Sequence, residues 1–128
     1  MSKIDKKNIL VVDDDNTNII AITDILEPEY DVYIARDGKE AIEVIESDRE
    51  INGVLLDLNM PNVDGFGVLE YFSTNELFKK IPVAVVTGVE NQADIDKAYT
   101  YPVIEVLRKP FNERDIKAIV EKLIDENW

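Results

Sequence analysis

Carboxylates are the most prominent side chains in this sequence that could carry chemistry. Asp13, Asp14 and Asp15 stand together directly after a run of apolar residues, and Asp57 directly follows another such run. Two carboxylates about 4 Å apart near a protein surface repel each other by roughly 4 kcal/mol, so a cluster of them needs a cation or a proton. Hard oxygen ligands of this kind favour Mg²⁺, which takes one or two carboxylates from a protein and keeps several waters.

A hydroxyl group and an ammonium group follow two further apolar runs. Thr87-Gly88 ends one run, and Lys109-Pro110 follows another. Lys109 could hold a phosphoryl oxygen, Thr87 could donate a hydrogen bond to a second one, and Gly88 leaves space for a bulky group. Together with a carboxylate nucleophile, this is the equipment that phosphoryl transfer requires.

Each of these residues also has an ordinary structural interpretation. Asp13 to Asp15 could cap a helix and favour its dipole, Thr87 could be a turn residue, and Lys109 could be a solvated charge. Asp57 is harder to explain in this way, because a charge directly after a buried strand costs free energy unless something uses it. The functional interpretation therefore depends on all of them meeting at one place.

The elements that would position these residues can be inferred from periodicity. Short continuous apolar runs are typical of parallel strands that are covered on both faces. The segments between them have apolar residues three or four apart, as in helices that bury one stripe. The predicted strands are Ile9–Val12, the weaker Val32–Ala35, Val54–Leu56, Val83–Val86 and Val103–Leu107.

Polar residues with good capping ability mark the start of each predicted helix. The last of these helices is expected to run from Glu113 to Glu126. The order is a strand and a helix repeated five times, which predicts an α/β fold with a doubly wound parallel sheet. Ligands of such sheets bind at the carboxyl ends of the strands, where all the residues above are placed. The predicted capping residues are Asp15 or Asn16, Asp37, Asp64, Asn91 and Asn112.

Composition excludes several classes of function. The 128 residues suit one domain, so we expect a single domain over 1–128 with no effector domain. The formal net charge of −13 makes direct binding to nucleic acid or to an anionic membrane a poor expectation. The chain has no cysteine and no histidine, which removes thiolate and imidazole chemistry. A polar start and the absence of a long apolar run predict a cytoplasmic protein.

Four segments, taken in order, resemble the receiver domain of two-component response regulators, and the resemblance covers essentially the whole chain. It implies a CheY-like, flavodoxin-like fold with strand order 2-1-3-4-5. It also implies a phosphorylated signalling domain that is not an enzyme in the usual sense, although it assists its own phosphorylation and dephosphorylation. The segments are Val11–Asp14, Leu56–Gly65, Val85–Gly88 and Lys109–Phe111.

The resemblance assigns roles to individual residues. Asp57 is expected to accept a phosphoryl group from a histidine on a partner kinase or a histidine phosphotransfer protein, because this chain has no histidine of its own. Mg²⁺ would be held by Asp14, Asp57 and the backbone carbonyl of Asn59, with Asp13 contributing through water. Thr87 would bind the transferred group, and Lys109 would pair with Asp57 or the phosphate. A cis Lys109–Pro110 peptide bond is also expected, with a downstream effector protein or domain as the output.

Two places depart from the family pattern. Receivers usually carry Tyr or Phe three residues before the lysine, where this chain has Val106, and a Gly-Ala pair often stands where this chain has Pro102-Val103. The usual route from the threonine to the aromatic residue is therefore in question. Tyr99 and Tyr101 are expected at the end of the fourth helix as packing or surface residues.

Two alternatives follow from the same residues. The stretch from Asp13 to Thr17 also resembles the start of haloacid-dehalogenase-type phosphatases, in which Asp13 would be the nucleophile and Asp15 the acid. That family needs another acidic pair after a later strand, and it leaves Asp57 without a role. The second alternative is a receiver-like scaffold that binds partners without being phosphorylated.

Overall fold

The computed structural model describes residues 6–47, 49–60, 64–75, 80–88 and 90–125. Within these residues, five strands alternate with five helices, as the sequence predicts. Pro61–Val63 of the recognised motif and Glu126 at the predicted end of the last helix lie outside the described residues. The elements are β1 (Asn8–Val12), α1 (Asn16–Leu26), β2 (Asp31–Ala35), α2 (Gly38–Glu46), β3 (Gly53–Leu56), α3 (Gly65–Thr74), β4 (Val83–Thr87), α4 (Gln92–Ala98), β5 (Val106–Arg108) and α5 (Glu113–Asp125).

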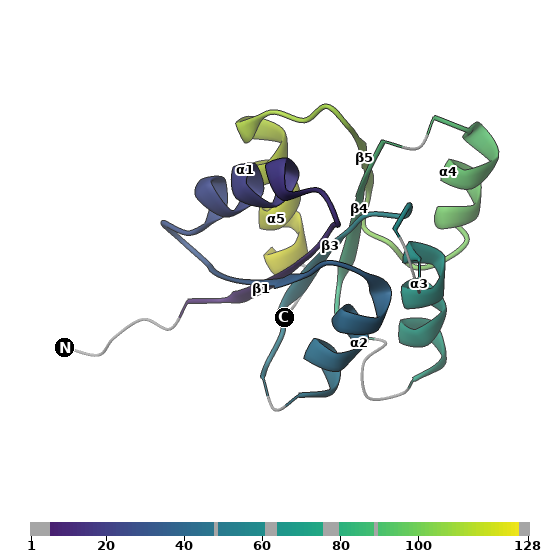
Figure 1. Ribbon diagram of the computed structural model, residues 1–128, viewed down its shortest axis with the longest axis horizontal. Coiled ribbons are helices and arrows are strands. Elements are labelled where there is room, and N and C mark those ends of the chain that lie inside the picture. The colour runs from purple at the N-terminus through teal and green to yellow at the C-terminus, as the bar shows by residue number, and fades with distance from the viewer. Residues whose placement is uncertain (1–5, 48, 61–63, 76–79, 89, 126–128) are drawn as a thin grey trace.

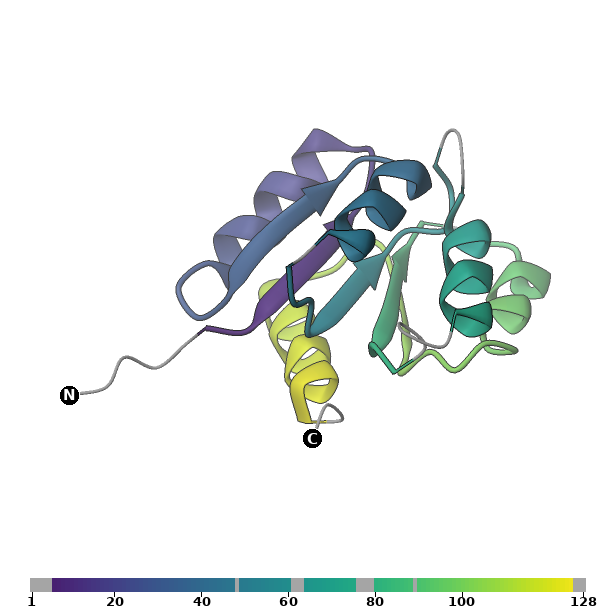
Figure 2. The ribbon, with the colours of Figure 1, turned by 90° about the horizontal axis from the view of Figure 1, so that it is seen from below.

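The strands form one parallel sheet in the order β2-β1-β3-β4-β5, which confirms the predicted flavodoxin-like topology. They lie side by side and run in the same direction (Figure 2). Helices α1 and α5 cover one face of the sheet, and α2, α3 and α4 lie on the other (Figure 1). The strand order reverses between β1 and β3, so the carboxyl ends of these two central strands border the crevice in which such folds bind ligands.

Two hydrophobic clusters hold the three layers together. Alternate residues of a strand point to opposite faces of the sheet. In β1, Ile9 and Val11 therefore pack with α1 and α5, while Leu10 and Val12 pack with α2 and α3. All four side chains are at most 1% exposed. This two-sided burial is why the central strands appear in the sequence as continuous apolar runs.

The helix starts agree with the predicted capping residues. The side chains of Asp15, Asp37, Asp64 and Asn91 each accept a backbone N–H from the first turn of their helix. Asn112 accepts from the N–H of Asp115 at 2.8 Å in the same way. Of the two candidates at the first helix, Asp15 is the cap. Each cap satisfies a backbone donor that has no partner within the helix.

The last strand is the element whose predicted bounds were wrong. It was expected at Val103–Leu107, but the regular strand is Val106–Arg108. Val85 pairs with Val106 and donates to the carbonyl of Glu105 at 2.9 Å. If this register continued, the backbone N–H of Glu105 would donate to the carbonyl of Val83. Instead, the N–H of Ile104 donates to that carbonyl, at 2.8 Å. The register thus shifts by one residue before Val106, and the ladder becomes regular only from that point.

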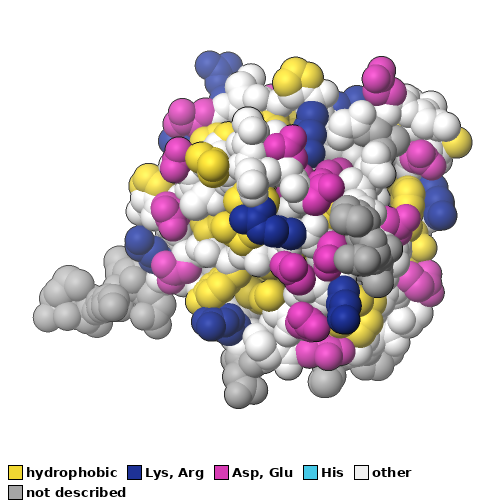
Figure 3. All heavy atoms as spheres, viewed as in Figure 1, with side chains coloured by type: hydrophobic (Ala, Val, Ile, Leu, Met, Phe, Trp, Pro, Cys, Tyr) yellow, Lys and Arg dark blue, Asp and Glu magenta, His cyan; other side chains and the backbone are white. Residues whose placement is uncertain are grey.

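No helix within the described ranges combines the length and the apolarity needed to cross a membrane. The acidic side chains outside the sheet's carboxyl edge are largely exposed, as at Asp24 on α1 and at Glu40 and Glu43 on α2. On the face drawn in Figure 3, the acidic side chains are dispersed among basic and uncharged ones. This part of the negative charge is therefore solvated and does not form a single patch on that face.

Candidate phosphoacceptor site

The carboxyl ends of four strands bring together the residues predicted to carry the chemistry. Asp13 follows β1, Asp57 follows β3, Thr87 ends β4 and Lys109 follows β5. Asp13 is 2% exposed, Asp57 is 5% exposed and Thr87 is fully buried. Ionisable side chains this far from solvent persist only where partners compensate them. The predicted convergence at one edge of the sheet is what the structure shows.

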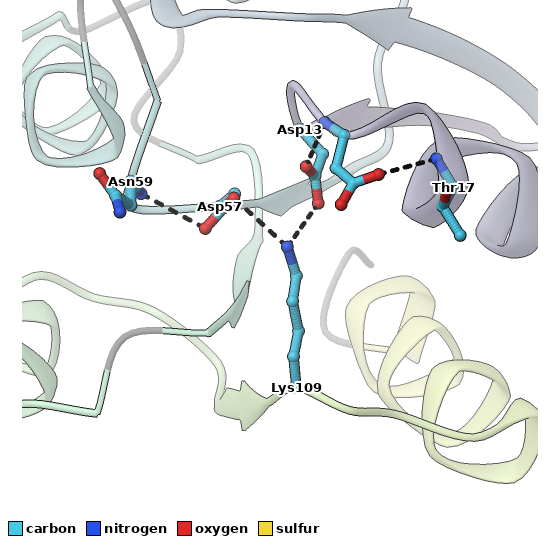
Figure 4. Close-up of polar contacts among 6 residues, drawn as sticks. Asp13, Thr17, Asp57, Asn59 and Lys109 are labelled. Atoms are coloured by element: carbon cyan, nitrogen blue, oxygen red, sulfur yellow. Dashed lines mark hydrogen bonds and ion pairs between the residues drawn. The ribbon is translucent and has the colours of Figure 1, made fainter.

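Lys109 supplies a counter-charge to two of the carboxylates. Its Nζ lies 2.8 Å from Oδ2 of Asp13 and 3.3 Å from Oδ2 of Asp57, between the two strands that carry them (Figure 4). Burial lowers the pKa of Lys109, but the hydrogen bonds and charges of Asp13 and Asp57 outweigh burial and raise it above its ordinary value. Lys109 therefore stays protonated at neutral pH and bridges β1 and β3 from the side of β5. The resemblance implied that Lys109 pairs with Asp57 or the phosphate, and the structure adds the shorter contact with Asp13.

The charged form of Asp57 is only partly compensated. Its Oδ1 accepts the backbone N–H of Asn59 at 3.3 Å, as drawn in Figure 4. Burial raises the pKa of Asp57 above its ordinary value, and the charge of Asp13 raises it further. Lys109, the Asn59 N–H and the Thr87 side chain lower it, but the net shift of the pKa is upward. The site therefore has room for further positive charge.

Asp13, Asp14 and Asp57 form the acidic cluster itself. Each can offer a carboxylate oxygen, and these oxygens all lie within 4.8 Å of one another. Asp13 and Asp57 are buried and Asp14 is exposed, so the cluster opens to solvent on one side. Lys109 contacts only two of the three carboxylates among the described residues, Asp13 and Asp57, so a divalent cation could neutralise the charge that remains. The donor set, three hard oxygens with open access for water, fits Mg²⁺.

The neighbouring Asp15 has a separate role. Its backbone N–H donates to Oδ1 of Asp13 at 2.9 Å, and its own carboxylate caps α1 by accepting the N–H of Thr17 at 2.8 Å. Both contacts are drawn in Figure 4. Asp15 thus orients Asp13 and starts the helix, so the run of three acids divides into two residues for the cluster and one for the helix.

A depression at the surface gives access to the cluster. Three of the residues that line it beside the acids are Asn59, Gly88 and Lys109. A Cβ on Gly88 would meet only Cδ of Lys109, at 3.9 Å, so the wall is open there. Thr87 is fully buried at the end of β4, directly before Gly88 in the lining. The sequence placed Thr87 correctly at the end of its strand but could not show its depth.

Residues 9–121 match the family model described as the response regulator receiver domain. The chain belongs to this family. It is a CheY-like receiver domain of two-component signalling. The Lys109–Pro110 peptide bond is cis, as the resemblance implied. Membership in this family replaces the haloacid-dehalogenase alternative, which made Asp13 the nucleophile and left Asp57 without a role.

Three proteins illustrate the range of relatives. The probable transcriptional regulator ycf27 of Cyanophora paradoxa is 34% identical over 129 residues, which cover 95% of this chain and 50% of that protein. The chain therefore spans half the length of this relative. A crystal structure of the phosphorylated cyanobacterial phytochrome response regulator RcpA is 28% identical, with a TM-score of 0.82 over 96% of this chain and 94% of that chain.

The third protein is similar in fold. It is the receiver domain of the sensor histidine kinase PA1611 from Pseudomonas aeruginosa PAO1, whose structure is described with a magnesium ion coordinated in the active-site cleft. It is 24% identical, with a TM-score of 0.85 over 94% of this chain and 99% of that chain. At this identity, the likeness shows the shared receiver fold.

Proposed function

We propose that Asp57 is the phosphoacceptor of this receiver and that its phosphorylation changes the binding of a downstream effector protein or domain. The observation that carries the proposal is the placement of the Asp57 carboxylate. It lies at the end of a central strand, beside Asp13 and within reach of Lys109, at the floor of an open depression. A scaffold without phosphorylation has no physical need to hold these carboxylates together.

Asp57 would act as the nucleophile in an in-line displacement. One carboxylate oxygen attacks the phosphorus atom of the donor, the new O–P bond forms, and the donor's N–P bond breaks with its electron pair returning to the imidazole nitrogen. The oxygen must be ionised for this attack. Lys109 and the Asn59 N–H favour the ionised form of Asp57, against the raised pKa that burial causes.

Asp13, Asp14 and Asp57 would hold Mg²⁺ together with the backbone carbonyl of Asn59, with Asp13 acting through a water molecule. The support is the convergence of the three carboxylates and the magnesium ion described in the cleft of the PA1611 receiver. When bound, the metal ion supplies charge that offsets the phosphoryl oxygens. Lys109 would balance the remaining charge, and Thr87 would donate a hydrogen bond to the group once it has arrived.

The proposed donor histidine lies outside these 128 residues. A phosphohistidine is the expected source, and this chain has no histidine, so the group comes from a histidine kinase or a histidine phosphotransfer protein. The acyl phosphate carries up to about −2 charges where the ionised carboxylate carried one, so the site gains about one negative charge. The RcpA structure, described as phosphorylated, supports a stable phosphorylated form in this fold. Nucleic acid is not proposed as a direct partner, given the net charge of −13.

The test is phosphorylation by a small phosphodonor. The purified chain is incubated with acetyl phosphate and Mg²⁺, and intact mass spectrometry follows the addition of one phosphoryl group. Peptide mapping after reduction of the acyl phosphate with borohydride locates the modified residue. We expect a single phosphoryl group to be added at Asp57. The addition should not occur when Mg²⁺ is chelated beforehand, and it should be absent in Asp57→Asn.

Two results would overturn the proposal. A stable adduct on Asp13, still present in Asp57→Asn, would make Asp13 the nucleophile. No uptake of phosphate from acetyl phosphate or from any phosphohistidine donor, with no binding of Mg²⁺ at millimolar concentration, would favour the unphosphorylated scaffold.

A further inference from the structure

The edge strand β5 connects the acidic site directly to helix α4. Lys109, which holds Asp13 and Asp57, immediately follows Arg108, the last residue of this three-residue strand. The backbone N–H of Lys109 donates to the carbonyl of Thr87 at 2.9 Å, which fixes the same residue to β4. Lys109 is therefore joined to the acidic site through its side chain and to β4 through its backbone, one residue beyond β5.

The first connection from β5 to α4 is made by Tyr99. The phenolic oxygen of Tyr99, the residue that ends α4, accepts the backbone N–H of Val106 at 3.1 Å. This hydrogen bond therefore holds Val106 on the side of β5 that forms the free edge of the sheet. The Tyr99 side chain is 53% exposed, so packing alone does not hold its ring. The hydrogen bond to Val106 is the contact that ties this end of the helix to the strand.

The second connection is at the other end of α4. The guanidinium group of Arg108 donates to Oε1 of Gln92, the first residue of the helix, at 3.1 Å. Helix α4 is thus tied to β5 at its first residue and at its C-cap. Both strand residues involved, Val106 and Arg108, lie within three positions of Lys109.

We propose that Tyr99 is a positioning residue that couples α4 to Lys109 through β5. In this chain an aromatic residue at the end of α4, Tyr99, contacts the last strand. Its hydroxyl group accepts the backbone N–H of Val106. When the partners of Lys109 change, as they would on phosphorylation of Asp57, the strand shifts and α4 shifts with it. The inference rests on the proposed function for its biological use, but the connection itself exists without a phosphoryl group.

Tyr101 offers a matched control. It lies two residues further along the chain, and its hydroxyl group donates to Oε1 of Glu70 on α3 at 3.1 Å. Tyr101 therefore ties the segment before β5 to a different helix. Tyr99→Phe and Tyr101→Phe each remove one phenolic oxygen and keep the ring, so their comparison separates the contact with β5 from a general loss of a hydroxyl group.

The first experiment measures backbone amide exchange by NMR in the unphosphorylated protein without metal. Losing one neutral hydrogen bond is worth about 1 kcal/mol, or about five-fold in an opening equilibrium. In Tyr99→Phe we expect the amide of Val106 to exchange about five-fold faster. In Tyr101→Phe we expect the rate at Val106 to stay within two-fold of the wild type. Equal rates at Val106 in the wild type and Tyr99→Phe would overturn the proposal.

The second experiment is a double-variant cycle that needs no phosphorylation. Lys109→Gln releases the end of β5 from the two carboxylates, and the amide shifts of α4, residues 92–98, report the response. We expect Lys109→Gln to shift these amides in the wild-type background and to shift them by less than half as much in the Tyr99→Phe background. A response of the same size in both backgrounds would refute the coupling. Lys109→Arg, which keeps the charge with a different reach, replaces Lys109→Gln if the latter does not fold.

Failure of the proposed function has a different signature. If the wild type takes up no phosphoryl group while the cycle still shows coupling, the phosphoacceptor assignment fails and the positioning role of Tyr99 stands. If Asp57 is phosphorylated but Tyr99→Phe leaves the phosphorylation-induced shifts in α4 unchanged, the phosphoacceptor assignment stands and the role of Tyr99 fails.

Discussion

Gly65 lies directly against the backbone of Asp57. A Cβ atom on Gly65 would stand 2.4 Å from the carbonyl oxygen of Asp57 and 2.5 Å from Cα of Leu58. The N–H of Gly65 donates to the carbonyl of Leu58 at 3.1 Å. The first residue of α3 thus packs on the segment that carries Asp57, and the absence of a side chain permits this distance.

Gly65→Ala should therefore destabilise the protein. Alanine favours a helix by about 1 kcal/mol over glycine, but the clash is with backbone atoms that cannot rotate away, and overpacking of this kind costs about 1–3 kcal/mol. We expect a net loss of up to about 2 kcal/mol, measured by urea denaturation. Gly88→Ala is the control, because its Cβ would meet only the flexible Lys109 chain at 3.9 Å. Equal losses in the two variants would contradict this account.

The sequence predicted most of the site because parallel topology makes strand ends meet. A recognisable apolar run precedes each of Asp13, Asp57, Thr87 and Lys109, and the ends of parallel strands share one edge of the sheet, which predicts that these residues meet there. The central strands were also the easiest to recognise, since they are apolar on both faces. The edge strand β2 is half-exposed, which is why its pattern was weaker.

The rest could not be predicted because it depends on three-dimensional detail that no periodicity encodes. The register shift at Ile104 leaves the apolar pattern of the last strand unchanged, so the strand appeared to begin too early. The contact of Tyr99 with Val106 depends on the direction in which a helix-ending side chain points. The recognised motif contained Gly65, but only the structure shows which backbone atoms it touches.

Asp57→Asn should change how stability depends on pH. The pKa of Asp57 is raised above its ordinary value of 3.8 in the folded protein, mainly by burial. Its favourable contribution to the free energy of unfolding is therefore full below about pH 3.8 and is lost as pH rises through the folded-state pKa. The asparagine side chain of the variant cannot ionise, so without Mg²⁺ we expect a higher Tm than the wild type at pH 7. The difference should close as pH falls towards 4.

Thermal unfolding across this pH range measures the effect, with a chelator present throughout. Asp31→Asn is the matched control, because Asp31 is exposed at the start of β2, at the opposite end of the sheet from the site. If Asp57→Asn were less stable than the wild type at pH 7, the attraction between Lys109 and ionised Asp57 would outweigh the free-energy cost of burying that charge.

Mg²⁺ should stabilise the wild type by an amount that rises with the logarithm of its concentration above its Kd. A ligand that binds only the folded state at ten times its Kd adds about 1.4 kcal/mol. We expect the Tm to rise with Mg²⁺ concentration in the wild type and in Asp31→Asn, and to rise much less in Asp14→Asn. The exposed Asp14 carboxylate is the member of the cluster that can be changed with the least disturbance of buried groups. A rise of the same size in all three proteins would place the bound ion elsewhere.

Lys109→Gln should destabilise the protein far more than removal of a surface lysine. Asp13 and Asp57 are buried and would lose their counter-charge, and breaking a buried pair from one side costs about 3–5 kcal/mol. Since the Lys109 side chain is itself 17% exposed, we expect about 2 kcal/mol at pH 7 without Mg²⁺. Lys117→Gln is the control. It breaks an exposed ion pair on α5, in which Nζ of Lys117 lies 2.9 Å from Oε2 of Glu113, and such pairs contribute little to stability.

The origin of that loss can be identified by two further measurements on Lys109→Gln. If uncompensated negative charge causes the loss, Mg²⁺ should restore part of the stability, because the ion supplies the missing positive charge. Acid should also restore part of it, because protonation of Asp57 removes the repulsion from Asp13. If Lys109 acted only through the packing of its methylene chain, neither Mg²⁺ nor acid would narrow the gap between the variant and the wild type. Urea midpoints at pH 7 and pH 5, with and without Mg²⁺, distinguish the two causes.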